Sequence, residues 1–231
     1  MRASDLAGLP IAAGAALRHR RFFHPAGVLA NGSIERLAPP TDGLPVESGT
    51  VVGRVSKAVG TPGALPDAAG LAWRMPPNPF AATPWDVLLV TAGFGSADAV
   101  PNRVLLRAVS TWSAAPYSSL LPLEHAGELW WVRARCSTPI GTTGLSLAAV
   151  REAIDGDGVR FDIEQARGRA EFEPLAALTL TDVIPAPEQH DDDVSFDPVR
   201  HSAPNVQIWP DWFRSFRAMA YRSSREGRGA E

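Results

Sequence analysis

The chain has 231 residues, of which 45% are hydrophobic, enough for one sizeable core in a single domain covering residues 1–231. Its net charge of −3 argues against a nucleic-acid partner, because such proteins normally carry a basic surplus. The single cysteine, Cys136, can form no internal disulfide and supports no cysteine metal site, as is usual in the reducing cytosol. No run reaches the roughly 20 apolar residues that a membrane-spanning helix needs. We therefore expect a soluble, cytoplasmic protein.

Most of the chain is expected to form strands. The first 20 residues are Ala-rich and are assigned to an N-terminal helix or arm. The 20 glycines and 21 prolines then divide the chain into short elements, which favours strands joined by turns over a helical bundle. Segments with strand-like content are residues 50–56, 69–75, 85–91, 128–136, 159–165 and 175–184.

Helices are expected in the second half of the chain. Residues 146–154 have apolar side chains at helical spacing behind a capping Ser146. A second helix is expected over 211–228, capped by Asp211. Between them, the Pro- and Asp-rich stretch 185–210 is expected to be an exposed connection that wraps the domain.

One face of the C-terminal helix mixes apolar and polar residues. It carries Phe213, Phe216, Arg217, Ala220 and Tyr221 at helical spacing. Taken alone, these residues favour an arginine and a tyrosine at the edge of a core, with their polar ends in water. The same pair could also hold a tyrosine as a phenolate, whose charge the guanidinium stabilises.

Motifs elsewhere favour the second interpretation. They are Arg21-Phe22-Phe23-His24 followed by Gly27, Gly53-Arg54-Val55-Ser56, Asp67 followed by Gly70 and Ala72, Trp85-Asp86-Val87, and Asp211 followed by Arg217, Tyr221 and Arg228. In order and spacing this set resembles the haem catalase family. The match extends over residues 21–229 and is densest in 21–35, 53–72 and 210–228. The chain is similar to a short catalase-related core without the arms and the C-terminal helical region.

The resemblance implies an α+β fold, an antiparallel β-barrel of about eight strands with outer helices, and haem b as the cofactor. Tyr221 would be the axial ligand of the haem iron, bound as phenolate, and Arg217 would donate to it. His24 would move a proton between the two oxygens of a peroxide, and Ser56 would orient its imidazole. The haem propionates would pair with Arg21, Arg54 and Arg228.

The chain departs from the family at one position near the expected peroxide site. The family has an asparagine shortly after the tryptophan–aspartate pair, and Val90 stands there in this sequence. Valine cannot hydrogen-bond, and the neighbouring Thr91 should point to the other face of the strand. The resemblance therefore implies a haem-dependent peroxidase or weak catalase that acts on hydrogen peroxide or organic hydroperoxides.

Other functions remain open. One alternative is a haem-binding or haem-sensing module without turnover, and another is a haem-free barrel that binds an apolar ligand. A third is a relative that rearranges fatty-acid hydroperoxides, and self-association into a homo-oligomer is also open. The run His190-Asp191-Asp192-Asp193 is interpreted as a solvated loop, and His19, His125 and His201 are expected at the surface.

Overall fold

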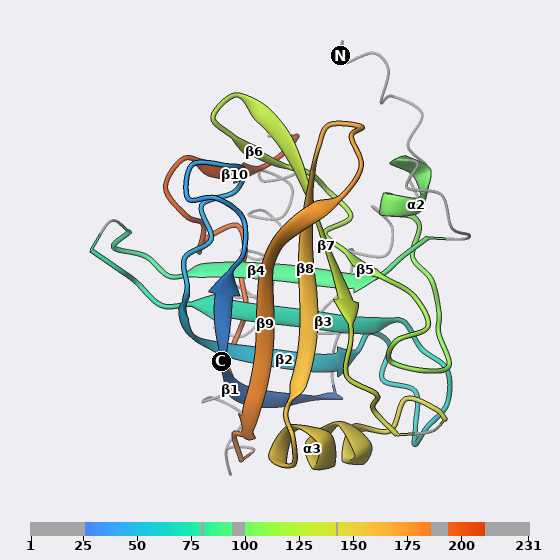
Figure 1. Cartoon of the computed structure of the whole chain (residues 1–231). Coiled ribbons are helices and arrows are strands. Elements are labelled where there is room, and N and C mark those ends of the chain that lie inside the picture. The colour runs from blue at the N-terminus through green and yellow to red at the C-terminus, as the bar shows by residue number, and fades with distance from the viewer. Residues whose placement is uncertain (1–25, 80, 94–99, 142, 186–193, 211–231) are drawn as a thin grey trace, which may run out of the picture.

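The computed structural model describes residues 26–79, 81–93, 100–141, 143–185 and 194–210. Within these ranges the strands join one antiparallel sheet, accompanied by two helices (Figure 1). The elements are β1 (Ala26–Arg36), β2 (Gly49–Lys57), β3 (Ala69–Met75), β4 (Trp85–Thr91), α2 (Val100–Val104), β5 (Tyr117–Ser118), β6 (Leu123–His125), β7 (Glu128–Cys136), α3 (Leu147–Asp155), β8 (Val159–Arg167), β9 (Glu173–Val183) and β10 (Val206–Ile208).

The sheet closes on itself. Its strand order is β10-β6-β7-β5-β4-β3-β2-β1-β9-β8, and β7 also pairs with β8 over seven residue pairs from Trp130↔Arg167 to Cys136↔Phe161. Among the described residues this pairing makes a closed barrel of eight strands, with β6 and β10 continuing the sheet beyond β7. The predicted antiparallel barrel of about eight strands is confirmed. Closure also leaves these eight strands without a free edge.

Alternation of buried and less buried side chains along β2, β3 and β8 sets the core inside the barrel. In β3, Leu71 and Trp73 are buried in the core, whereas the intervening Ala72 and Arg74 are only partly buried. The same period of two holds in β2 and β8, because successive side chains of a strand point to opposite faces. The predicted strand segments are confirmed to within one or two residues at each end.

The helix α3 lies beneath one end of the barrel (Figure 1). It begins after Ser146, whose hydroxyl accepts a hydrogen bond from the backbone N–H of Ala149 at 3.3 Å, as predicted for the cap. Val150 and Ile154 are fully buried, and the helix ends at Gly156. Its apolar face therefore packs against the barrel, mainly along β9 and β1.

The second half of the predicted connection 185–210 is more ordered than its composition indicates. Residues 206–208 form β10, which pairs antiparallel with β6. Val206 and Ile208 are buried, with 4% and 8% of their surface exposed. The prediction of an exposed connection is wrong for this part, because its apolar residues pair with and cover the sheet extension. The expected elements at 1–20 and 211–228 lie outside the described residues.

Candidate functional site

Ser56 lies on the outward face of the barrel. Its neighbour Val55 belongs to the core, so Ser56 points to the opposite side of β2. In register, Ser56 pairs with Gly27 of β1 and with Gly70 of β3, and Gly70 pairs in turn with Val90 of β4. These residues form one row across four strands. The residues on both sides of Ser56 in this row are glycines, and Ser56 itself is 4% exposed.

Arg54 lies one row away on the same face of β2. Its register partners are Leu29 in β1 and Ala72 in β3. A Cβ added at Gly27 would lie 2.6 Å from Nε of Arg54, so the guanidinium group occupies the space that a side chain at position 27 would fill. Arg54 is half-buried and takes part in further interactions. A cation is therefore held next to the row of Ser56.

Val90 occupies the position at which the family resemblance implies an asparagine. It is 9% exposed and lies two strands from Ser56, on the other side of Gly70. Thr91 is fully buried on the opposite face, where its hydroxyl donates to the Arg107 carbonyl at 2.7 Å and accepts from the Ala69 N–H at 3.0 Å. Thr91 therefore cannot replace the missing amide of the outward row.

The structure brings together only part of the predicted site. Ser56 and Arg54 share the outward face of β2, with Val90 close by on β4. The remaining predicted site residues, His24, Arg21, Arg217, Tyr221 and Arg228, lie outside the described residues. Among the described residues no group of three or more His, Cys, Asp or Glu side chains could hold a metal ion.

The outward face of β1 to β4 has the surface that a flat macrocycle with carboxylate substituents requires. Gly70 and Ala72 add little bulk to it, the guanidinium of Arg54 lies over Gly27, and the half-buried Leu29 and Leu88 are apolar. A hydroxyl lies in the row at its centre, and a guanidinium lies beside that row. The described residues thus fit haem: an apolar floor, one hydrogen-bonding group and one cation suited to a propionate.

A polar cluster that the sequence did not predict lies one row beyond that of Arg54, on β3 and β4. Arg74 and Asp86 are register partners on β3 and β4, joined by two hydrogen bonds of 2.6 and 2.7 Å. The Asp86 carboxylate is fully buried and also accepts from the backbone N–H of Asp197 at 2.7 Å. Nδ1 of His201 lies 2.8 Å from the same carboxylate. The hydrogen bond to Asp86 raises the pKa of Arg74 above its ordinary value, although burial opposes the rise.

This cluster ties residues 195–201 to the barrel. The Asp86 N–H donates to the His201 carbonyl at 2.9 Å, and Nη2 of Arg74 donates to the Ser195 carbonyl at 2.8 Å. His201, which was expected at the surface, keeps 29% of its side chain exposed, but it also contacts Asp86 and Arg74. Only register could have revealed the pair, since Arg74 and Asp86 lie on separate strands and His201 is 115 residues from Asp86.

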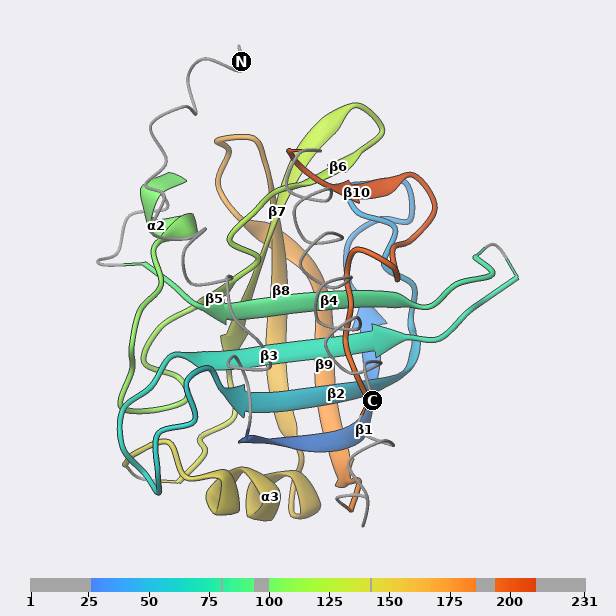
Figure 2. The ribbon, with the colours of Figure 1, turned by 180° about the vertical axis from the view of Figure 1, so that it is seen from behind.

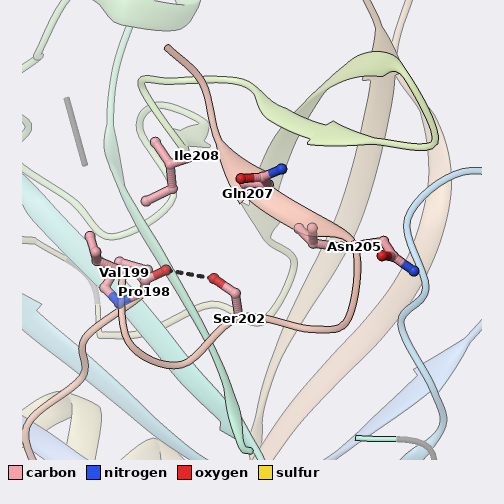
Figure 3. Close-up of a pocket in the computed structure, with 7 residues that line it drawn as sticks. Pro198, Val199, Ser202, Asn205, Gln207 and Ile208 are labelled. Atoms are coloured by element: carbon pink, nitrogen blue, oxygen red, sulfur yellow. Dashed lines mark hydrogen bonds between the residues drawn. The ribbon is translucent and has the colours of Figure 1, made fainter. Parts of the chain in front are cut away.

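A cavity of about 240 Å³ lies elsewhere, within residues 198–208 (Figure 3). Its lining comprises Pro198, Val199, Ser202, Asn205, Val206, Gln207 and Ile208. The Ser202 hydroxyl is bonded to the Pro198 carbonyl at 2.9 Å. The lining contains no ionisable group and no residue from β1 to β4, so the cavity is separate from the candidate site.

Comparison with solved structures supports the same architecture. Catalase A from Saccharomyces cerevisiae superposes with a TM-score of 0.64 and 10% identity, covering 89% of this chain and 60% of that one. A fungal catalase superposes with a TM-score of 0.61 and 12% identity, covering 92% of this chain and 61% of that one. The chain thus spans about 60% of the length of these structures. No protein-family model and no curated protein matches the sequence. The fold is that of the catalase core.

Proposed function

We propose, from this catalase-like fold, that the outward face of β1 to β4 binds haem b in a peroxide-handling enzyme. The enzyme would be a peroxidase or weak catalase that acts on hydrogen peroxide or organic hydroperoxides. The observation that carries the proposal is the row Gly27, Ser56, Gly70 and Val90, with Arg54 beside it. It offers a hydroxyl and a cation beside small residues, on the face of β1 to β4 that is turned away from the packed core.

The described residues have distinct roles in this proposal. The Ser56 hydroxyl would hydrogen-bond to the imidazole of His24, three residues before its register partner Gly27, and so hold the ring in one orientation. His24 would then move the proton between the two peroxide oxygens. Arg54 would bind a propionate, because its guanidinium can make paired hydrogen bonds to a carboxylate.

The remaining roles fall to residues near the C-terminus. Tyr221 would bind the iron as a phenolate, and Arg217, one helical turn before it, would favour that ionised form by its positive charge. Arg21 and Arg228 would pair with the propionates. When bound, haem would supply redox chemistry, and the negative charge of the Tyr221 phenolate would favour the ferric state.

Val90 affects which peroxide the proposed site would favour. Its side chain is apolar and lies in the row of Ser56, so the peroxide side of the site has one hydrogen-bonding group fewer than an asparagine would supply. Turnover of hydrogen peroxide should therefore be slow, whereas an alkyl hydroperoxide can place its carbon chain against the valine. This reasoning favours organic hydroperoxides over hydrogen peroxide.

Val90 also favours a second candidate function. A haem-binding or haem-sensing module without turnover needs the iron ligand and the propionate arginines, but no amide beside the peroxide. The absorption spectrum and an assay of donor oxidation separate the two functions. A sensor shows the spectrum of bound haem but does not oxidise a donor when peroxide is added.

The test is the absorption spectrum of the protein loaded with haem, before and after addition of peroxide. We expect a high-spin ferric Soret band that is lost or shifted in Tyr221→Phe. His24→Ala should keep the haem while peroxide reactivity falls by at least about 100-fold, as is usual when an acid–base group is removed. An unchanged spectrum in Tyr221→Phe would contradict the ligand assignment.

Arg54→Gln tests the described part of the site. It should weaken haem binding by about 1.5–3 kcal/mol, the usual contribution of a hydrogen bond to a charged group. Arg160→Gln is the matched control, because Arg160 lies on β8 and forms an exposed pair with Asp162. A folded protein that takes up no haem would leave the apolar-ligand barrel as the remaining interpretation.

A further inference from the structure

Residues 195–201 lie against the same outward face of the barrel as the candidate site. Asp86 is on that face of β4, four residues before Val90, and it pairs in register with Arg74 on β3. Rows on one face of a strand are two residues apart, or about 7 Å, so the row of Arg74 and Asp86 is about 14 Å from the row of Ser56. Figure 2 shows the connection that contains residues 195–201 outside β3 and β4.

The hydrogen bonds of Arg74 decide which ring nitrogen of His201 carries a hydrogen. Nη2 of Arg74 has two hydrogens, and it donates them to Oδ2 of Asp86 at 2.7 Å and to the Ser195 carbonyl at 2.8 Å. It therefore has no hydrogen left for Nδ1 of His201, which lies 3.0 Å away. Oδ2 of Asp86 lies 2.8 Å from the same Nδ1 and can only accept. Nδ1 of His201 therefore carries the hydrogen and donates it to Asp86.

Asp86 fixes residues 195–201 at two points. Its Oδ2 also accepts from the backbone N–H of Asp197 at 2.7 Å, and its own backbone N–H donates to the His201 carbonyl at 2.9 Å. Between these points the His201 N–H donates to the Asp197 carbonyl at 2.9 Å, which closes the segment into one turn. The guanidinium carbon of Arg74 lies 5.5 Å from the centre of the Phe196 ring. The segment is therefore held to the barrel through one buried carboxylate and the arginine paired with it.

We propose that residues 195–201 form a wall that bounds the candidate site beside Arg74, and that Asp86 and His201 are the positioning residues of this wall. The inference rests on the proposed function, because the wall would then limit which peroxides reach a haem bound on this face. Displacing the wall breaks hydrogen bonds to a buried carboxylate, which is costly. The wall therefore sets an upper limit on the size of the organic group: a small alkyl hydroperoxide fits beside it, whereas a bulky aryl hydroperoxide has to displace it.

The first test is hydrogen–deuterium exchange of the full chain without haem, followed by mass spectrometry. His201→Ala removes the donor to Asp86, so exchange at residues 195–201 should rise by at least about 10-fold. His201→Asn keeps a side-chain N–H near the position of Nδ1 and should return exchange close to that of the wild type. Both variants should fold, because 29% of the His201 side chain is exposed. Unchanged exchange in His201→Ala would overturn the positioning role.

The second test is the ratio of kcat/KM for cumene hydroperoxide to kcat/KM for ethyl hydroperoxide in the haem-loaded protein. His201→Ala should raise this ratio by at least about 10-fold, the lower end of what discrimination by a pocket provides. The change should come from a lower KM for the bulky substrate, and His201→Asn should restore the wild-type ratio. A substitution that only destabilises the protein would lower both values alike. An unchanged ratio in His201→Ala would overturn the wall.

The two tests separate the wall from the proposed function. A wild type that takes up no haem would contradict the proposed function, and with it the selection of peroxides by the wall. The exchange measurement needs no haem, so it would still decide whether His201 positions residues 195–201.

His125→Ala is the matched control. Nδ1 of His125, on β6, lies 3.1 Å from the carbonyl of Asn205, so this substitution also removes a histidine contact to the connection, but beyond residue 201. It should leave both the exchange at residues 195–201 and the ratio of kcat/KM values unchanged. An equal rise in His125→Ala and His201→Ala would mean that loosening the connection at any point is sufficient, and would overturn the roles assigned to Asp86 and His201.

Discussion

Ser56 and Val90 lie on opposite sides of the same glycine, Gly70, in one outward row of the barrel. The row thus contains the hydroxyl of Ser56, which the resemblance to catalases implies, and Val90, which stands where that resemblance implies an asparagine. Both side chains are largely buried, at 4% and 9% exposure. A substitution at either position tests the contribution of that one side chain to the proposed reaction.

Val90→Asn should raise the rate of hydrogen peroxide consumption. The new amide would add a hydrogen-bonding group to the row of Ser56, and such a group typically contributes about 10-fold or more to kcat/KM. Because the amide enters a largely buried position, we expect a loss of about 1–3 kcal/mol in unfolding free energy. Oxygen release by the haem-loaded variant, together with urea unfolding, measures both effects.

Leu88→Asn is the control for this substitution. Leu88 lies two residues earlier on the same outward face of β4, in the row of Arg54. It should give no gain in oxygen release. An equal gain in both variants would mean that polarity in general, and not the row of Ser56, controls the reaction.

Asp86→Asn should be strongly destabilising, by about 3–5 kcal/mol. Its fully buried carboxylate balances the charge of Arg74, and removing one partner of a buried pair leaves the other charge uncompensated. Asp162→Asn should cost under about 1 kcal/mol, because Asp162 and Arg160 are each about half exposed. Urea unfolding of the two variants tests this contrast, and equal losses would contradict the role assigned to the cluster.

Asp67 should make stability sensitive to acid. Burial alone would raise the pKa of Asp67, but hydrogen bonds from the backbone of Thr61, Val59, Gly60 and Ala68 outweigh it and lower the pKa below 3.8. Because the folded-state pKa is lowered, this stabilisation is fully present above the unfolded-state value and is lost as the pH falls through the folded-state value.

Asp67→Asn isolates that contribution. At pH 7 the free energy of unfolding of the variant should be about 1.5–3 kcal/mol lower than that of the wild type, the usual contribution of a hydrogen bond to a charged group. The difference should shrink as the pH falls below 3.8, because the carboxylate of the unfolded chain then takes up a proton before that of the folded protein does. Urea unfolding at pH 7 and near pH 3 measures the change, and a difference that grows in acid would refute the assignment.

Cys136 should react slowly with thiol reagents. Burial raises the pKa of its thiol to about 12, with a further contribution from the negative charge of Asp162. The thiolate is the reactive form, so alkylation at pH 8 should be at least about 100-fold slower than that of a free thiol. Iodoacetamide labelling followed by mass spectrometry checks this, with labelling in urea as the control. Rapid labelling of the folded protein would contradict the raised pKa of the partly buried Cys136 thiol.

Most of the longer elements could be predicted from the sequence because their signals are local, but the 11-residue strand β1 was not among the predicted segments. The period of two along β3 and the Ser146 cap of α3 each depend on neighbouring residues, and both are confirmed. The strands β5, β6 and β10 span two or three residues, too few for a period to be recognised. The resemblance to haem catalases supplied the barrel, which periodicity alone does not distinguish from an open sheet.

The sequence by itself determined which residues can carry the proposed chemistry, since hydroxyl, guanidinium and phenol groups are read directly from it. Tertiary structure decided which of them meet. The pairing of β2 with β3 and of β3 with β4 sets Ser56, Gly70 and Val90 in one row. It also sets Arg74 beside Asp86 and brings His201 to that pair from 115 residues away. Such contacts depend on strand register and barrel closure, which bring together residues distant in sequence.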